Sequence, residues 1–168
     1  MGENITIEQL NSIEEHIEEL SELLVKVVDG GASIGFLPPL QRTVAEKFWR
    51  NVLNPDVILF VAKINNEIAG TVQLHLCSKQ NGKHRAEIAK LMTHPYYRRN
   101  GVARHLMKIT EERAKEENRS LLVLDTREGD PSNILYNSLG FNQAGKIPYF
   151  AQSGNGELEP TIIYYKTI

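Results

Sequence analysis

The sequence is poor in cysteine, with Cys77 as the only one in 168 residues. A single cysteine excludes an intrachain disulfide and any metal site built from several cysteines, and it fits a reducing compartment. Small apolar thiols are most often packed groups, so we expect Cys77 to be structural and not a nucleophile. The five histidines show no metal-ligand spacing, and no metal centre is predicted.

Long apolar runs and an excess of charge are also missing. No stretch approaches the roughly 20 apolar residues that cross a bilayer, and the amino terminus lacks the basic and apolar regions of an export signal. Nineteen basic residues against twenty-one acidic residues leave a formal charge of −2. This balance excludes bulk attraction to nucleic acid or an anionic membrane. We expect a cytoplasmic protein with neither kind of partner.

We expect residues 1–168 to form one domain. Along it, apolar residues recur every second position in some segments, as in strands, and every three or four positions in others, as in helices. Ser12 with Glu15, and Thr43 with Glu46, have the spacing of capping boxes that begin two helices. The chain predicts strands at 4–9, 57–64, 68–76, 85–93, 121–124, 141–147 and 160–166, and helices at 12–29, 43–53, 101–118 and 132–139. The helix at 101–118 joins two strands, so we expect a crossover with parallel pairing in a mixed α/β domain.

A basic turn follows the strand at 85–93 and opens into the next helix. The first backbone N–H groups of a helix lack intrahelical partners and carry the positive end of its dipole. Gly101 lets a phosphate approach closely, and Ala103 is small enough not to block it. The predicted diphosphate ligands are Arg98, Arg99, Asn100, Gly101, Val102, Ala103 and Arg104. The alternative is a solvated basic turn, and the chain has neither G-x-x-x-x-G-K-[ST] nor G-x-G-x-x-G.

Two motifs in order carry a resemblance to a known family. Arg98-x-x-Gly101-x-Ala103 after an apolar strand resembles the acetyl-CoA diphosphate signature of the GNAT N-acetyltransferases, and Asn133-x-x-Tyr136-x-x-x-Gly140-Phe141 resembles their second motif. The resemblance implies a mixed, mostly antiparallel central sheet with helices on both faces, and acetyl-CoA as cofactor. It also places the pantetheine arm against the backbone of Leu91, Met92 and Thr93, as if it were an added strand.

Stretches outside these motifs resemble a branch of the family. Gln73-Leu74-x-Leu76-Cys77, Lys90-Leu91-Met92 and Leu124-Asp125-Thr126 are similar to the tabtoxin resistance acetyltransferases, which acetylate a small amino-acid-like β-lactam toxin. The chain differs from them in two places. It has Ala103 where they have glycine, and its Leu139-Gly140-Phe141 has the form found more generally in the GNAT family. The resemblance implies an N-acetyltransferase for a small amine, with a role in antibiotic or toxin resistance.

Transfer of an acetyl group to an amine needs a base, because an ammonium has no lone pair with which to attack. Glu87 lies on the strand that leads to the cofactor motif, where the resemblance places a glutamate base. Asp125 lies at the carboxyl end of a strand, where open sheets present ligands. We predict that both bind the ammonium and remove its proton. The alternatives are an ion pair of Glu87 with Arg85 or Lys63, and a turn cap at Asp125.

A phenol near the sulfur of the cofactor can protonate the thiolate that leaves. Tyr136 in the second motif is the candidate, with Asn133 orienting either the pantetheine arm or the start of its helix. The alternative is that Tyr136 only packs on the cofactor. Without a reactive cysteine in the motifs, we expect direct attack by the amine in a ternary complex.

For the acceptor wall we predict backbone and hydroxyl donors of a glycine-rich loop, together with aromatic side chains. The residues are Asp29, Gly31, Ser33, Phe36, Trp49 and Tyr149. As alternatives, Gly30 and Gly31 end a helix, and Phe36 and Trp49 belong to the core.

Two other functions stay open, acetylation of a protein or peptide amine and a CoA-binding sensor without catalysis. An edge strand is compatible with homodimerisation, which the sequence does not show.

Overall fold

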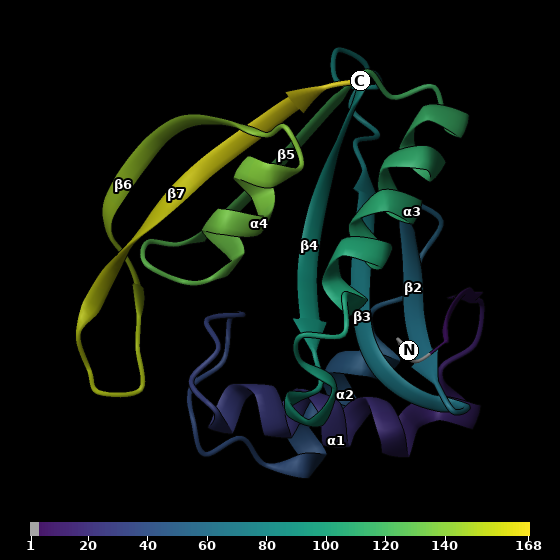
Figure 1. Cartoon of the computed structure of the whole chain (residues 1–168), viewed down its shortest axis with the longest axis vertical. Coiled ribbons are helices and arrows are strands. Elements are labelled where there is room, and N and C mark those ends of the chain that lie inside the picture. The colour runs from purple at the N-terminus through teal and green to yellow at the C-terminus, as the bar shows by residue number, and fades with distance from the viewer. Residues whose placement is uncertain (1–3) are drawn as a thin grey trace.

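The computed structural model describes residues 4–168, which form one seven-stranded sheet with helices on both faces (Figure 1). Its elements are β1 (Ile5–Leu10), the 3-10 turn η1 (Glu14–His16), α1 (Ile17–Asp29), α2 (Arg42–Arg50), β2 (Val57–Ile64), β3 (Glu67–Leu76), β4 (Arg85–Thr93), the 3-10 turn η2 (Pro95–Tyr97), α3 (Val102–Glu116), β5 (Leu121–Arg127), α4 (Ser132–Ser138), β6 (Asn142–Gln152) and β7 (Leu158–Thr167). No helix within residues 4–168 is long and apolar enough to span a membrane.

The strand order is β1-β2-β3-β4-β5-β7-β6. β4 and β5 are parallel, as predicted from the helix between them, and every other pair is antiparallel. The helix α3 returns the chain to the end of the sheet at which β4 began, so β5 runs in the same direction as β4. A direct turn would instead join two antiparallel strands. The expected mixed, mostly antiparallel sheet is therefore confirmed.

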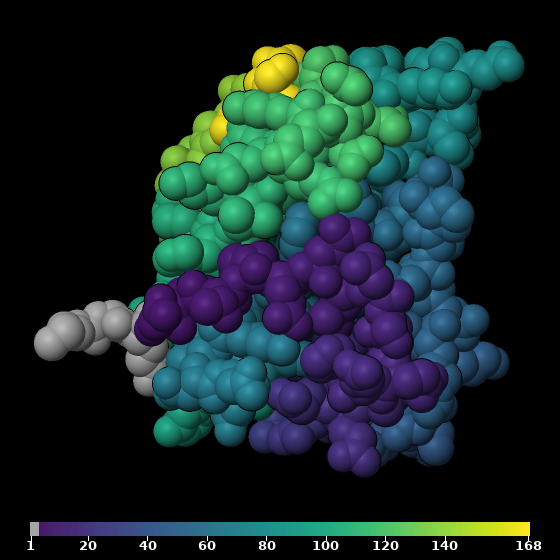
Figure 2. Space-filling model, turned by 90° about the vertical axis from the view of Figure 1, so that its right-hand side faces the viewer, coloured from purple at the N-terminus to yellow at the C-terminus, as the bar shows by residue number. Residues whose placement is uncertain are grey.

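The strands bury both faces because successive side chains point to opposite sides of a sheet. In β2, Ile58 and Phe60 pack in the core under α3, whereas Leu59 and Val61 pack in the core under α1 and α2. The edge strand β1 lies beside α3, where Arg113 donates a hydrogen bond of 2.9 Å to the Gln9 side-chain oxygen. Figure 2 shows this amino-terminal part in purple against α3 in green.

Both predicted capping boxes are wrong. A 3-10 turn precedes α1, whose first residue is Ile17, and α2 begins one residue before Thr43. No side-chain cap hydrogen bond forms at the N-cap positions Ile13, His16 or Gln41. Packing of the apolar stripe supplies most of the stability of a short helix, so the contacts of α1 with the sheet and of α2 with α1, not the caps, set where these helices begin.

The feature that positions the site is the separation of β4 from β5. β4 pairs with β3 from Ala86 to Thr93 but with β5 only over the three residues Arg85 to Glu87. The β3 ladder shifts register between Thr71 and Gln73, and Lys90 opposite this shift has a φ of 54°. A bulge of this kind bends and twists its strand. Figure 1 shows β4 and β5 starting together and diverging, which leaves one edge of β4 open.

Candidate active site

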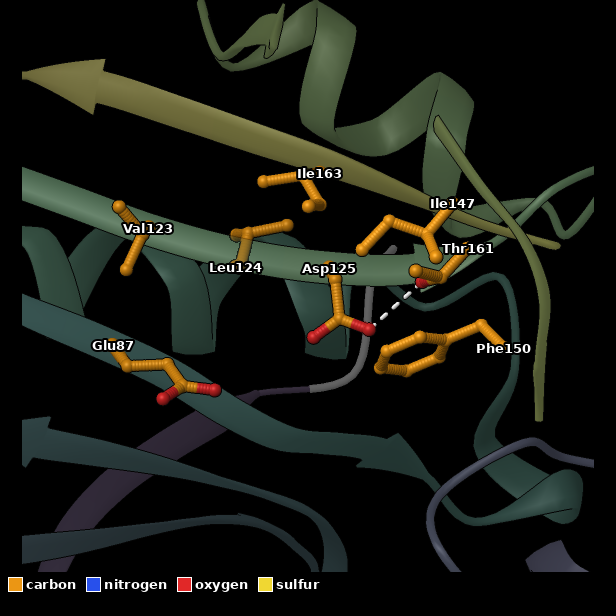
Figure 3. A pocket seen from close by; sticks show the side chains of 8 residues that line it. All are labelled: Glu87, Val123, Leu124, Asp125, Ile147, Phe150, Thr161 and Ile163. Carbon is orange, nitrogen blue, oxygen red and sulfur yellow. Dashed lines mark hydrogen bonds between the residues drawn. The ribbon is translucent and has the colours of Figure 1, made fainter. Parts of the chain in front are cut away.

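A pocket of about 160 Å³ lies where β4 and β5 separate (Figure 3). Apolar side chains make most of its wall, and the two carboxylates of Glu87 and Asp125 enter it from the two strands. The residues that line it are Glu87, Val123, Leu124, Asp125, Ile147, Phe150, Thr161 and Ile163. The structure therefore brings the two predicted base residues to one gap, although 38 positions of sequence separate them.

Glu87 occupies the last position at which β4 pairs with β5, opposite Val123, and its side chain is exposed. The alternative, an ion pair with Arg85 or Lys63, does not form, and Lys63 instead pairs with Glu8 at 2.8 Å. Within residues 4–168 no Lys, Arg or His nitrogen forms an ion pair with the Glu87 carboxylate. The carboxylate is thus available to a cationic ligand.

Asp125 is held by the neighbouring strand and does not cap a turn. Its Oδ2 accepts a hydrogen bond of 2.8 Å from the Thr161 hydroxyl, and Thr161 is buried at 3% exposure. This buried donor orients the carboxylate. In Figure 3 the other oxygen of Asp125 points into the gap, on the side where Glu87 enters it. No local sequence signal points to Thr161, since its hydrogen bond with Asp125 spans 36 residues.

The predicted diphosphate turn has the free donors that an anion requires. Within residues 4–168 the backbone N–H groups of 98–104 donate no hydrogen bond to a backbone carbonyl or a side chain. Arg99 and Gly101 both have positive φ, 64° and 80°, which turns successive N–H groups toward one side. Arg98 and Arg99 are exposed, while Arg104 is fixed to the Ser138 hydroxyl at 2.8 Å. These residues fit the diphosphate of acetyl-CoA.

The open edge of β4 fits the rest of that molecule. Beyond Glu87 the strand pairs on one side only, so the backbone groups on the other side have no strand partner within the described chain. An extended amide chain can add to such an edge. The Met92 side chain is buried in the core under α1 and α2, so this residue can meet the pantetheine arm only through its backbone.

A substitution at Gly101 tests the diphosphate turn. Gly101→Val places a β-branched residue at a φ of 80°, which costs about 1–2 kcal/mol and turns the free N–H groups away from the anion. We expect about tenfold weaker binding of acetyl-CoA in calorimetry. Gly156→Val is the matched control, because Gly156 has a φ of 88° in the turn between β6 and β7. Equal loss of affinity in both variants would contradict the assignment.

Tyr136 is buried on α4 at 5% exposure, and its ring packs 5.9 Å from that of Phe141 and 5.8 Å from that of Tyr164. Burial raises the pKa of the Tyr136 phenol well above its ordinary range, and the negative charge of Asp125 raises it further. The hydroxyl therefore stays protonated at neutral pH, as a proton donor requires. No hydrogen bond within residues 4–168 engages this hydroxyl.

Asn133 has the second of its two predicted roles. Its amide nitrogen donates to the carbonyls of Arg127 and Asp130, each at 2.9 Å, and its oxygen accepts from the Tyr164 hydroxyl at 2.8 Å. Both amide hydrogens are used, so they are not available to the pantetheine arm. Of the two predicted roles, the side chain therefore has the one that fixes the turn at the start of α4.

The predicted acceptor loop lies beside the pocket, but two of its residues have structural roles. Asp29 accepts a hydrogen bond of 3.0 Å from the Leu40 N–H and so closes the base of the loop. The Gly31 carbonyl accepts from Arg127 at 2.9 Å, which ties the loop to the end of β5. Phe36 is half-buried and packs edge-on against Phe48 at 5.3 Å, and Ser33 is half-buried.

The predicted acceptor contact of Trp49 is wrong, and Tyr149 lies outside the pocket lining. Trp49 is fully buried, and its Nε1 donates to the Leu20 carbonyl at 2.8 Å, so it belongs to the core between α1 and α2. Tyr149 is 76% exposed and does not line the pocket, whereas its neighbour Phe150 does. The pairing of β6 with β7 is irregular between Ile147 and Ala151, which breaks the alternation of side chains along β6.

Comparison with known proteins agrees with this geometry. The model of the acetyltransferase (GNAT) family matches residues 17–141. An uncharacterised N-acetyltransferase from the hisH–hisA intergenic region of Azospirillum brasilense is 30% identical over 129 residues, which cover 74% of this chain and 77% of that one. The chain therefore belongs to the GNAT family of acetyltransferases. Members of this family use acetyl-CoA, so the family membership confirms the predicted cofactor.

Solved structures share the fold at low sequence identity. An N-acetyltransferase from Staphylococcus aureus has a TM-score of 0.83 at 14% identity, with 98% of both chains covered. The protein yncA from Salmonella typhimurium, solved with its cofactor acetyl-CoA, has a TM-score of 0.80 at 16% identity over 98% of this chain and 94% of that one. At these identities the likeness establishes the architecture, and the acceptor has to be argued from the pocket.

Proposed function

We propose that the protein transfers the acetyl group of acetyl-CoA to the amine of a small molecule bound between Glu87 and Asp125. The observation that carries the proposal is the pair of carboxylates in one pocket, with no ion pair to a cation of the described chain. Two anionic groups in a mostly apolar wall attract an ammonium. The open edge of β4 next to them is where the acetyl donor fits.

Bound acetyl-CoA supplies an activated acetyl group as a thioester. Glu87 and Asp125 hold the ammonium of the acceptor and take its proton, directly or through water, so that the nitrogen can attack. Backbone N–H groups of β4 near Met92 polarise the acetyl carbonyl. The Tyr136 hydroxyl then protonates the sulfur that leaves. Cys77 does not line the pocket, so the transfer is direct.

The pocket is sized for a small acceptor. Its volume of about 160 Å³ is below the roughly 300–1,000 Å³ of drug-sized sites. Arg127 connects the acceptor loop with the hairpin of β6 and β7, because its guanidinium donates both to the Gly31 carbonyl and to the Ser153 hydroxyl. An amino-acid-like toxin of the β-lactam class is an acceptor of this size, and the sequence resembles acetyltransferases that act on such a toxin. Its acetylation in the cytoplasm would be a resistance function.

The test is a panel of amines with acetyl-CoA, in which release of the CoA thiol is followed. The panel contains amino acids, simple amines, short peptides and tabtoxinine-β-lactam. We expect amine-dependent thiol release with a small acceptor and an initial-rate pattern typical of a ternary complex. Release only with peptides would contradict the small-molecule proposal. Binding of acetyl-CoA without release across the whole panel would instead indicate a sensor.

A further inference from the structure

Lys90 lies on β4 three residues beyond Glu87, at the bulge where the strand bends away from β5. The side chain is half-buried, and its Nζ donates a hydrogen bond to the Ile34 carbonyl in the acceptor loop. The same ammonium lies 5.7 Å from the centre of the Phe36 ring and 5.8 Å from that of Phe48. The residue thus connects the strand of the predicted base with the wall of the acceptor site.

The charge of this ammonium has no close counter-ion in the protein. None of the ion pairs within residues 4–168 includes Lys90, and one carbonyl accepts only one of its three hydrogens. Burial lowers the pKa of Lys90, while the charges of Asp125 and Glu87 act on it in the opposite direction. A half-buried cation without a counter-ion in contact is costly, and an anionic ligand removes that cost.

The loop above Lys90 offers further donors. Within the described part of the chain, the backbone N–H groups of 33–37 donate no hydrogen bond, and the Ser33 hydroxyl has no partner. Gly35 has a φ of 94°, and a Cβ at this position would lie 2.9 Å from the Lys90 Nζ. The absence of a side chain at Gly35 therefore keeps the space around the ammonium open.

We propose that Lys90, with the N–H groups of the 33–37 loop, binds a carboxylate of the acceptor, whose amine lies between Glu87 and Asp125. The inference rests on the proposed function and narrows it, since the acceptor is then an amino acid or an amino-acid-like zwitterion. The ammonium of this zwitterion meets Glu87 on β4 and Asp125 on β5, and its carboxylate meets Lys90 on β4. Lys90 is in this account a specificity residue, which takes no part in the proton transfer.

The experiment compares Lys90→Met with the wild type on amino acids of the panel and on their methyl esters. Methionine keeps the packing under Phe36 and Phe48 but removes the charge. We expect the KM for the free amino acids to rise about 10- to 100-fold, as for loss of a charge-assisted hydrogen bond. The KM for the esters should change less than about threefold. Esterification changes the pKa of the amine. This change affects the wild type and Lys90→Met equally, so it cancels when the KM values of the two proteins are compared on the same acceptor. Lys115→Met, on the exposed face of α3, is the matched control.

An equal rise of KM for acids and esters would overturn the inference, because Lys90 would then only hold the loop. An unchanged KM for the acids would overturn it as well. If the wild type acetylates no amine of the panel, the proposed function fails, and the same amino acids and esters are titrated in calorimetry. Binding of the acid by the wild type, lost in Lys90→Met, then supports the carboxylate site by itself, and absence of that binding refutes it.

Discussion

Glu87→Gln and Asp125→Asn should each lower kcat/KM by roughly 100-fold or more at neutral pH, since general base catalysis contributes about 10²- to 10⁴-fold. Both substitutions keep the size of the side chain and remove its negative charge. Each variant therefore loses attraction for the ammonium together with the capacity to accept its proton. Initial rates of thiol release over a range of pH measure the effect.

The pH profile separates the two roles. If the lost function is proton removal, the rate of the variant should recover as pH rises, because the amine then loses its proton to solvent without help. If the lost function is only binding of the ammonium, KM rises and kcat stays near that of the wild type. Glu8→Gln is a suitable control, since Glu8 is an exposed carboxylate of β1 paired with Lys63. Near-normal turnover of both variants across pH would refute the assignment.

Tyr136→Phe should lower kcat by about 100-fold while the affinity for acetyl-CoA changes little. Only the hydroxyl is lost, and the ring contacts with Phe141 and Tyr164 can stay. Single-turnover rates and calorimetry with acetyl-CoA measure the two quantities.

Tyr164→Phe is the control for Tyr136→Phe, because it also deletes a buried phenol hydroxyl, the one that binds Asn133. Since burial raises the pKa of Tyr136, ionisation of this phenol should not limit the rate as pH rises through the ordinary range of tyrosine. A loss of acetyl-CoA affinity as large as the loss of kcat would show that Tyr136 only packs on the cofactor.

The strands and the crossover could be predicted because their signals are local. The periodicity of a strand or a helix is visible among neighbouring residues. A helix between the strands at 85–93 and 121–124 is a crossover connection, which favours parallel pairing. The turn at 98–104 was predictable for the same reason, since its glycine and its place before α3 are adjacent in the sequence. The predicted starts of the first two helices are wrong because the packing of α1 on the sheet and of α2 on α1, which local sequence does not show, outweighs the caps.

The acceptor side of the site depends on contacts between distant segments. Phe150 reaches the pocket, and Tyr149 does not, because β6 loses its regular pairing with β7 between Ile147 and Ala151. Lys90 meets the loop through a carbonyl 56 residues away, and no spacing in the sequence predicts that contact. Trp49 and Phe36 are both aromatic, yet only the three-dimensional packing shows that Trp49 is fully buried and Phe36 half-buried.

The most direct test of the central claim uses the double variant Glu87→Gln/Asp125→Asn, with acetyl-CoA binding and amine-dependent thiol release measured on the same sample. We expect acetyl-CoA affinity to stay within about threefold of the wild type, because the turn at 98–104 and the open edge of β4 are untouched. Amine-dependent release should fall to the level measured without protein. Release within about threefold of the wild type would contradict the claim that these two carboxylates activate the amine.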